Sequence, residues 1–121
     1  MDKKNSFFSS FKYAFSGIFS ALKKERNLKI HFCAMILVII AGILLKISKL
    51  EWIICLILFA LVISSELINT AIEQTVDIAS PDINEKAKLA KDCGAGAVLV
   101  CAIVSAIIGL IIFIPKIIAL F

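Results

Sequence analysis

The chain has 121 residues, of which 61% are hydrophobic, and it carries a formal net charge of +4. A soluble domain this small cannot bury so large an apolar share, since about 45–50% is typical of soluble domains. These values exclude an ordinary soluble globular protein and predict a single membrane-embedded domain over residues 1–121. The net charge is moderate, and we expect no nucleic-acid partner.

Residues from about 6 to 25 are predicted to form an amphipathic surface helix. Residues 1–5 before it are not followed by a short apolar core with a cleavage site, so we expect no removable signal peptide. A basic helix with an aromatic stripe suits the membrane interface. Packing of that stripe against the protein's own helices is an equally good interpretation, and both can hold together. The stripe recurs at three- and four-residue spacing and contains Phe7, Phe8, Phe11, Phe15, Ile18, Phe19 and Leu22.

Three longer apolar stretches predict three transmembrane helices. The first is short for a span, but the lysines at its ends can extend towards the two interfaces. We expect Ser80 to cap the third span, Pro81 to lie in its first turn, and Pro115 to end it. The spans are predicted at about residues 29–46, 50–78 and 84–114.

The positions of lysine and arginine predict the orientation, because these residues favour the cytoplasmic side. Ten of them lie before the first span or in the 78–92 loop, whereas three lie in the 46–51 turn or near the C-terminus. We therefore expect the N-terminus to face the cytoplasm and the C-terminus to lie outside the cell membrane.

The second predicted span carries polar residues on one face. Glu66, Asn69, Glu73 and Asp77 are three, four and four residues apart, so they share an arc of roughly 80°. Carboxylates are costly inside a membrane and by default mark function. Counted at about 1.5 Å per residue from Trp52, Glu66 lies roughly 21 Å and Glu73 roughly 32 Å along the helix, against a hydrocarbon core of about 30 Å.

This order of depths suggests a division of roles. Glu66, just inside the inner leaflet, can meet the hydroxyl of a membrane lipid alcohol. Glu73 lies at the interface, where Mg²⁺ and a soluble nucleotide are available, and Glu25 could supply a second ligand, since Mg²⁺ commonly takes one or two carboxylates plus phosphate oxygens. Lys91 offers a cation for phosphate, and the neighbouring Asp92 could orient that lysine.

The residues alone leave other interpretations open. Intramembrane acids and amides can also join helices by hydrogen bonds, and proton or cation translocation fits nearly as well as phosphoryl transfer. No GxxxxGK[ST] loop, and no GxGxxG after a strand, decides between them. We interpret Gly94 and Gly96 as sites of close helix packing, and His31 as an interfacial polar residue rather than a phosphorylated intermediate. The four cysteines stand singly and are interpreted as small hydrophobic residues rather than a zinc or redox site: Cys33, Cys55, Cys93 and Cys101.

The segment ELINTAIEQTVD at residues 66–77 resembles the bacterial diacylglycerol kinase family. The resemblance covers nearly the whole chain and implies an ATP-dependent lipid kinase of the bacterial plasma membrane. It also implies a homotrimer of three-span subunits, with active sites shared between neighbouring subunits. The other matching segments are FKYAFSG at 11–17, ERN at 25–27, AKD at 90–92 and AGAVL at 95–99.

The resemblance also implies roles for single residues by their motif positions. Glu66 matches the catalytic base, and Glu25 and Glu73 match the carboxylates that hold the divalent metal. Lys91 and Asp92 match the nucleotide-phosphate region. The remaining positions are Asn69 and Asp77, which match polar residues needed for activity, and Tyr13, Asp82, Ile83 and Asn84, which fall where family members approach ATP, although Asn84 replaces a histidine often found there.

Two lipid alcohols are candidate substrates. Within the family, Gram-positive-type members act on undecaprenol and Gram-negative-type members on diacylglycerol. The FKYAF segment and the KDxxAGAVL run look more like the former, so we expect undecaprenol. Diacylglycerol is the alternative, and a non-enzymatic cation pathway is the second alternative.

Overall fold

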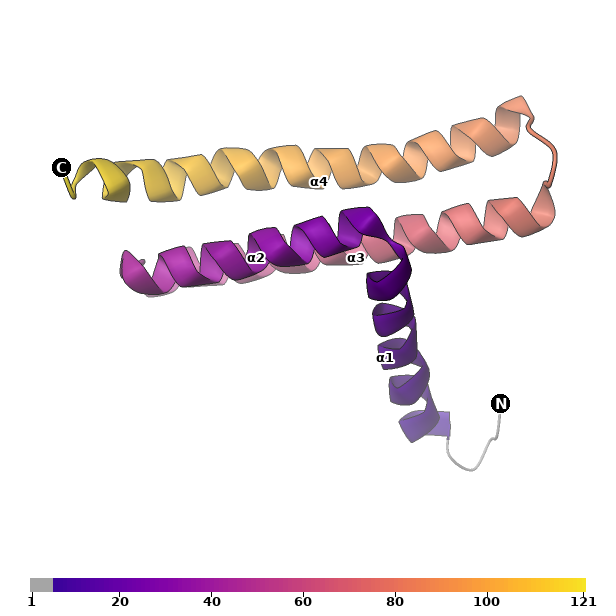
Figure 1. The fold of residues 1–121 in the computed structure, drawn as a ribbon, viewed down its shortest axis with the longest axis horizontal. Helices are drawn as coiled ribbons and strands as arrows, with labels where there is room; N and C mark the ends of the chain where they lie inside the picture. Colours follow the sequence, from indigo (N-terminus) through magenta and orange to yellow (C-terminus); the bar gives the residue numbers. More distant parts are fainter. Residues whose placement is uncertain (1–5) are drawn as a thin grey trace.

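The computed structural model describes residues 6–121, and residues 1–5, for which we expect no signal peptide, lie outside the described part. The chain is helical throughout, and three of its helices are long and apolar enough to cross a membrane. These three run side by side, while the first helix leads steeply away from them (Figure 1). The all-helical prediction is therefore confirmed, and three long apolar helices fit the predicted spans. The helices are α1 (Ser6–Lys24), α2 (Arg26–Leu44), α3 (Lys49–Ala79) and α4 (Glu85–Ile118).

Most apolar side chains of these helices lie on the surface. Leu37 on α2, Ile68 on α3 and Leu110 on α4 are each more than half exposed. Exposed apolar surface costs about 25 cal/mol per Å² in water, and patches this extensive mark a membrane or protein interface. The surface is therefore that of a membrane protein.

Helix α3 is the element on which the others pack. Helices α2 and α4 both contact it, and within residues 6–121 they do not pack on each other. The space between them holds an apolar cavity of about 250 Å³. Its lining comes from all three helices and includes His31, Val38, Phe59, Val62, Ser105 and Ile112.

Short polar contacts fix the end of the bundle where α2 turns into α3. Ser48 and Glu51 form a capping box, in which Glu51 N donates to Ser48 Oγ at 3.2 Å and Ser48 N donates to Glu51 Oε1 at 2.8 Å. Glu51 also pairs with Lys116 of α4 at 3.1 Å. This end of the bundle is thus held by backbone caps and one ion pair between helices.

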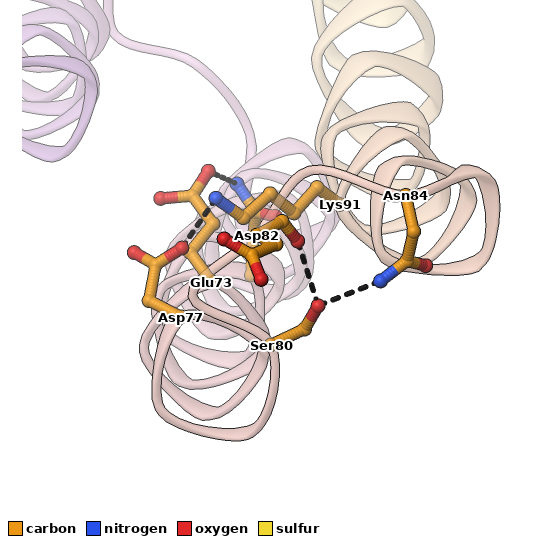
Figure 2. A network of polar contacts seen from close by, with 7 residues as sticks. Glu73, Asp77, Ser80, Asp82, Asn84 and Lys91 are labelled. Carbon is orange, nitrogen blue, oxygen red and sulfur yellow. Dashed lines mark hydrogen bonds and ion pairs between the residues drawn. The ribbon is translucent and has the colours of Figure 1, made fainter.

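The turn between α3 and α4 differs from the sequence prediction. Ser80 does not cap α4 but closes α3, and its Oγ donates to the backbone oxygen of Asp82 at 2.8 Å. Asn84 is the cap of α4, since its side chain accepts from Ala87 N at 2.9 Å, and its amide donates to Ser80 Oγ at 2.6 Å (Figure 2). Asn caps a helix as well as Ser does, and the Ser80 hydroxyl is already used within the turn.

Two predicted helix ends also shift. Helix α4 does not end before Pro115 but continues to Ile118. Proline removes one backbone hydrogen bond and crowds the preceding turn, but its own carbonyl can still accept a helical hydrogen bond. The Pro115 carbonyl still accepts from Ala119 N at 3.1 Å. Helix α2 begins at Arg26 rather than near residue 29, directly after Glu25, whose backbone is extended.

Gly94 allows α3 and α4 to approach closely. A Cβ added there would collide with Asn69 Oδ1, whereas a Cβ added at Gly96 would meet nothing within 4 Å in the chain. Within one chain, the interpretation as a packing position is therefore confirmed for Gly94, whereas Gly96 has no such contact.

We expect Gly94→Ala to be less stable than Gly96→Ala by about 1–3 kcal/mol, because only the first overpacks a buried contact. Both variants gain the roughly 0.5–1 kcal/mol that alanine contributes inside a helix, so Gly96→Ala serves as the matched control. The measurement is reversible unfolding of the purified protein in mixed micelles with increasing denaturing detergent. Equal stability of the two variants would contradict the close contact at Gly94.

Candidate active site

Glu66 is a buried carboxylate in the middle part of α3. Its exposed fraction is 3%, and its Oε1 lies 3.3 Å from Nε2 of His31 on α2. Burial of an unpaired carboxylate costs several kcal/mol, so a donor from the neighbouring helix is needed to hold it there. The pair joins α2 to α3 at the polar face of α3.

Asn69 and Glu73 continue this face by one further turn. The Asn69 side chain is buried, and its Nδ2 donates to Glu73 Oε1 at 3.3 Å. Asn69 Oδ1 is also buried and, among the contacts of residues 6–121, has no hydrogen-bond donor. A buried amide oxygen without a donor is rare and is one feature of functional sites.

Two further carboxylates lie near Glu66 at this level of the bundle. The charges of Glu25 and Glu73 both bear on the Glu66 carboxylate, and Glu25 is half-buried at the junction of α1 and α2. Like charges gathered in this way are stabilised by a cation, and carboxylate oxygens are the ligands that Mg²⁺ prefers. Residues 6–121 contain no group of three or more His, Cys, Asp or Glu side chains placed to hold a metal. Glu25 and Glu73 have the ligand type that Mg²⁺ prefers, and an ion held by these two carboxylates would take its other ligands from phosphate and water.

Lys91 lies at the end of this face, but its partner is not the one expected. Its Nζ pairs with Asp77 Oδ1 at 2.5 Å, across from α4 to α3, beside Glu73 (Figure 2). Asp92 does not orient Lys91, because it pairs with Lys88 at 2.6 Å one turn away on the same helix. The i,i+4 spacing on an exposed helix face favours that local pair.

The other predicted nucleotide residues lie on α1 and in the turn between α3 and α4. Tyr13 lines an open groove of about 300 Å³ between α1 and α3, beside Thr70. Asp82 and Asn84 stabilise the α3–α4 turn through Ser80, and Ile83 is almost fully exposed in that turn. Asn84 therefore stabilises the fold as the N-cap of α4.

The contact between His31 and Glu66 is missing from the sequence prediction. His31 is the single histidine of the chain and one of few polar residues of α2. A polar group inside an apolar span needs a partner on a neighbouring helix, so the sequence could have predicted that His31 has such a partner. The identity of the partner depends on how α2 docks on α3.

The grouping of a buried carboxylate, an acidic pair and a lysine suits transfer of a charged group to a membrane-borne acceptor. Glu66 lies near the middle of α3, and the Asp77–Lys91 ion pair lies near the C-terminal end of that helix. Phosphoryl transfer requires this kind of positioning and charge compensation.

Comparison with known proteins identifies the family. The chain matches the model of prokaryotic diacylglycerol kinase over residues 12–113. It is 47% identical over 112 residues to the undecaprenol kinase of Bacillus subtilis, a match that covers 93% of this chain and 91% of that protein. It is 38% identical over 112 residues to the diacylglycerol kinase of a Synechocystis species, covering 92% of this chain and 64% of that protein.

A shorter match, 46% identical over 66 residues, relates 54% of this chain to 47% of the diacylglycerol kinase of a Sinorhizobium species. These relatives are lipid kinases, so the non-enzymatic cation pathway is wrong as an interpretation of the acidic face. The chain belongs to the prokaryotic diacylglycerol kinase family and is a lipid kinase of that family.

Proposed function

We propose that this lipid kinase phosphorylates undecaprenol, with ATP as the phosphate donor and Mg²⁺ as the metal. The observation that carries the choice of lipid is the 47% identity to an undecaprenol kinase over almost the full length of both proteins. The match to a diacylglycerol kinase is weaker, at 38% identity, and covers 64% of that protein. Diacylglycerol is therefore the less favoured substrate.

Glu66 is proposed as the general base. Its carboxylate accepts the proton of the lipid hydroxyl as that oxygen attacks the γ-phosphorus of ATP. One P–O bond forms to the lipid, the bridging P–O bond to the β-phosphate breaks, and ADP leaves. The burial of Glu66 on α3 supports this role, because a base that serves a lipid alcohol must lie where the lipid headgroup can reach it.

Glu25 and Glu73 are proposed to hold Mg²⁺, which when bound offsets negative charge on the phosphate oxygens. The action of both charges on Glu66 supports their convergence. Asn69 supports this arrangement through its hydrogen bond to Glu73, which fixes one oxygen of that carboxylate.

Lys91 is proposed to bind the nucleotide phosphates, with Asp77 holding the lysine beside Glu73 until the nucleotide arrives. The ion pair between these two residues supports this order of events. The other residues proposed to surround the nucleotide are Asp92, Tyr13, Asp82, Ile83 and Asn84.

We also propose an orientation in the membrane and an oligomeric state. The N-terminus and the α3–α4 turn face the cytoplasm, where ATP is available, and the C-terminus lies outside. Helix α1 lies along the membrane interface with its exposed phenylalanines in the headgroup region, which its steep departure from the bundle supports (Figure 1). Three copies form a homotrimer with shared sites, as the resemblance to the family implies.

The test of the substrate is a side-by-side kinase assay of the purified protein with labelled ATP and each lipid alcohol in matched micelles. We expect kcat/KM for undecaprenol to exceed that for diacylglycerol. Greater turnover of diacylglycerol would reverse the proposed preference, and no phosphate transfer to either lipid would end the proposed function.

Glu66→Gln should lower kcat by roughly 10²–10⁴-fold, the range that a general base contributes, while nucleotide binding largely survives. Initial rates and nucleotide titrations of the same preparation measure both quantities. Glu51→Gln is the matched control, because it changes the same residue type near the other end of the same helix. Activity of Glu66→Gln close to that of the wild type would remove Glu66 from the role of base.

Glu73→Gln should raise the Mg²⁺ concentration needed for half-maximal activity by at least roughly tenfold. Residues that only hydrogen-bond to a metal ligand can change metal affinity by that factor, and loss of a ligand should have at least the same effect. Rates measured across a magnesium titration at saturating nucleotide check this expectation. An unchanged Mg²⁺ dependence would show that Glu73 is not a ligand.

A further inference from the structure

The imidazole of His31 lies directly on the carboxylate that the proposed reaction uses as a base. Nε2 of His31 is 3.3 Å from Oε1 of Glu66, and the two side chains are 23% and 4% exposed. The contact joins α2 to α3, so it depends on the docking of two helices rather than on one helix alone. His31 also lines the apolar cavity between α2, α3 and α4.

A glutamate needs help to present one defined oxygen to a substrate. Its terminal torsion is broad, so a carboxylate held only by its own stem samples many orientations. A donor on Oε1 fixes the plane of the group and leaves Oε2 as the oxygen that can take a proton. Asn69, one turn further along the same face, donates to Glu73, so the described polar contact of Glu66 with a neighbouring helix is the one to His31.

We propose that His31 is a positioning residue for the phosphoryl transfer. Its Nε2–H donates to Glu66 Oε1 and holds the carboxylate so that Oε2 faces the lipid hydroxyl. The inference rests on the proposed role of Glu66 as the base. In this role His31 acts only through Glu66 and contacts neither the nucleotide nor the attacking oxygen of the lipid.

Two substitutions of His31 test its hydrogen-bond donor and its ring separately. His31→Phe keeps a planar ring of similar size in the cavity wall but removes the hydrogen bond to Glu66. His31→Gln restores an N–H donor at a similar distance from the backbone. The loss of one hydrogen bond to a charged group corresponds to roughly a tenfold to hundredfold loss of rate. Because the contact orients the base, we expect the loss in kcat rather than in KM for ATP.

The kinetic experiment uses the full chain in micelles with undecaprenol and ATP. We expect His31→Phe to lower kcat by roughly 10- to 100-fold at nearly unchanged KM for ATP, and His31→Gln to recover most of that loss. Lys116→Gln is the matched control, since it removes another polar contact between helices, the one to Glu51, far from the polar face. Its kcat should equal that of the wild type.

The contact itself can be measured without turnover. His31 is the single histidine, so ¹⁵N-histidine labelling gives the signals of one imidazole. We expect the Nε2 signal to move in Glu66→Gln and to stay in place in Lys116→Gln, because only the first change removes the charged acceptor.

Three results would overturn the inference: wild-type kcat in His31→Phe, no recovery in a folded His31→Gln, or an unmoved Nε2 signal in Glu66→Gln. Failure of the proposed function looks different, because the wild type itself would then transfer no phosphate to either lipid. In that case the imidazole signal still reports whether His31 and Glu66 are in contact.

Discussion

The structure depends on keeping a carboxylate inside the apolar part of a helical bundle. A charged side chain at the centre of a membrane costs at least about 2.5–3.5 kcal/mol on insertion scales, and Glu66 is almost fully buried. The contact with His31 offsets part of this cost, so α2 must dock on α3 in one register. The same constraint then gives Glu66 a defined environment, which a base requires.

Helix α3 connects the two environments that a lipid kinase has to join. Its 31 residues extend over about 46 Å, well beyond a hydrocarbon core of about 30 Å. Polar pairs join α3 to its neighbours at three positions along its length. Glu51 in its first turn pairs with Lys116, Glu66 near its middle contacts His31, and Asp77 near its end pairs with Lys91. Helices α2 and α4 contact α3 rather than each other, so the position of each in the bundle depends on α3.

The sequence predicted the features that local geometry determines. Helical periodicity and apolar length placed three spans, and a rigid helix puts Glu66, Asn69 and Glu73 on one face whatever surrounds it. Contacts between helices were not predictable in this way.

The pairing of His31 with Glu66, and of Lys91 with Asp77, depends on how far one helix slides along another. A close approach such as that at Gly94 sets this register, and a single sequence does not reveal it. The turn was misassigned for a related reason, because serine and asparagine are equally good caps and only the competing bond of Ser80 decides between them.

The ion pair between Lys91 and Asp77 has a consequence for the way a nucleotide would be held. A lysine that already pairs with a carboxylate has part of its charge offset, so it attracts a phosphate less strongly than an unpaired lysine would. Such a contact holds a nucleotide weakly, which suits an abundant donor whose product, ADP, has to leave before the next turnover.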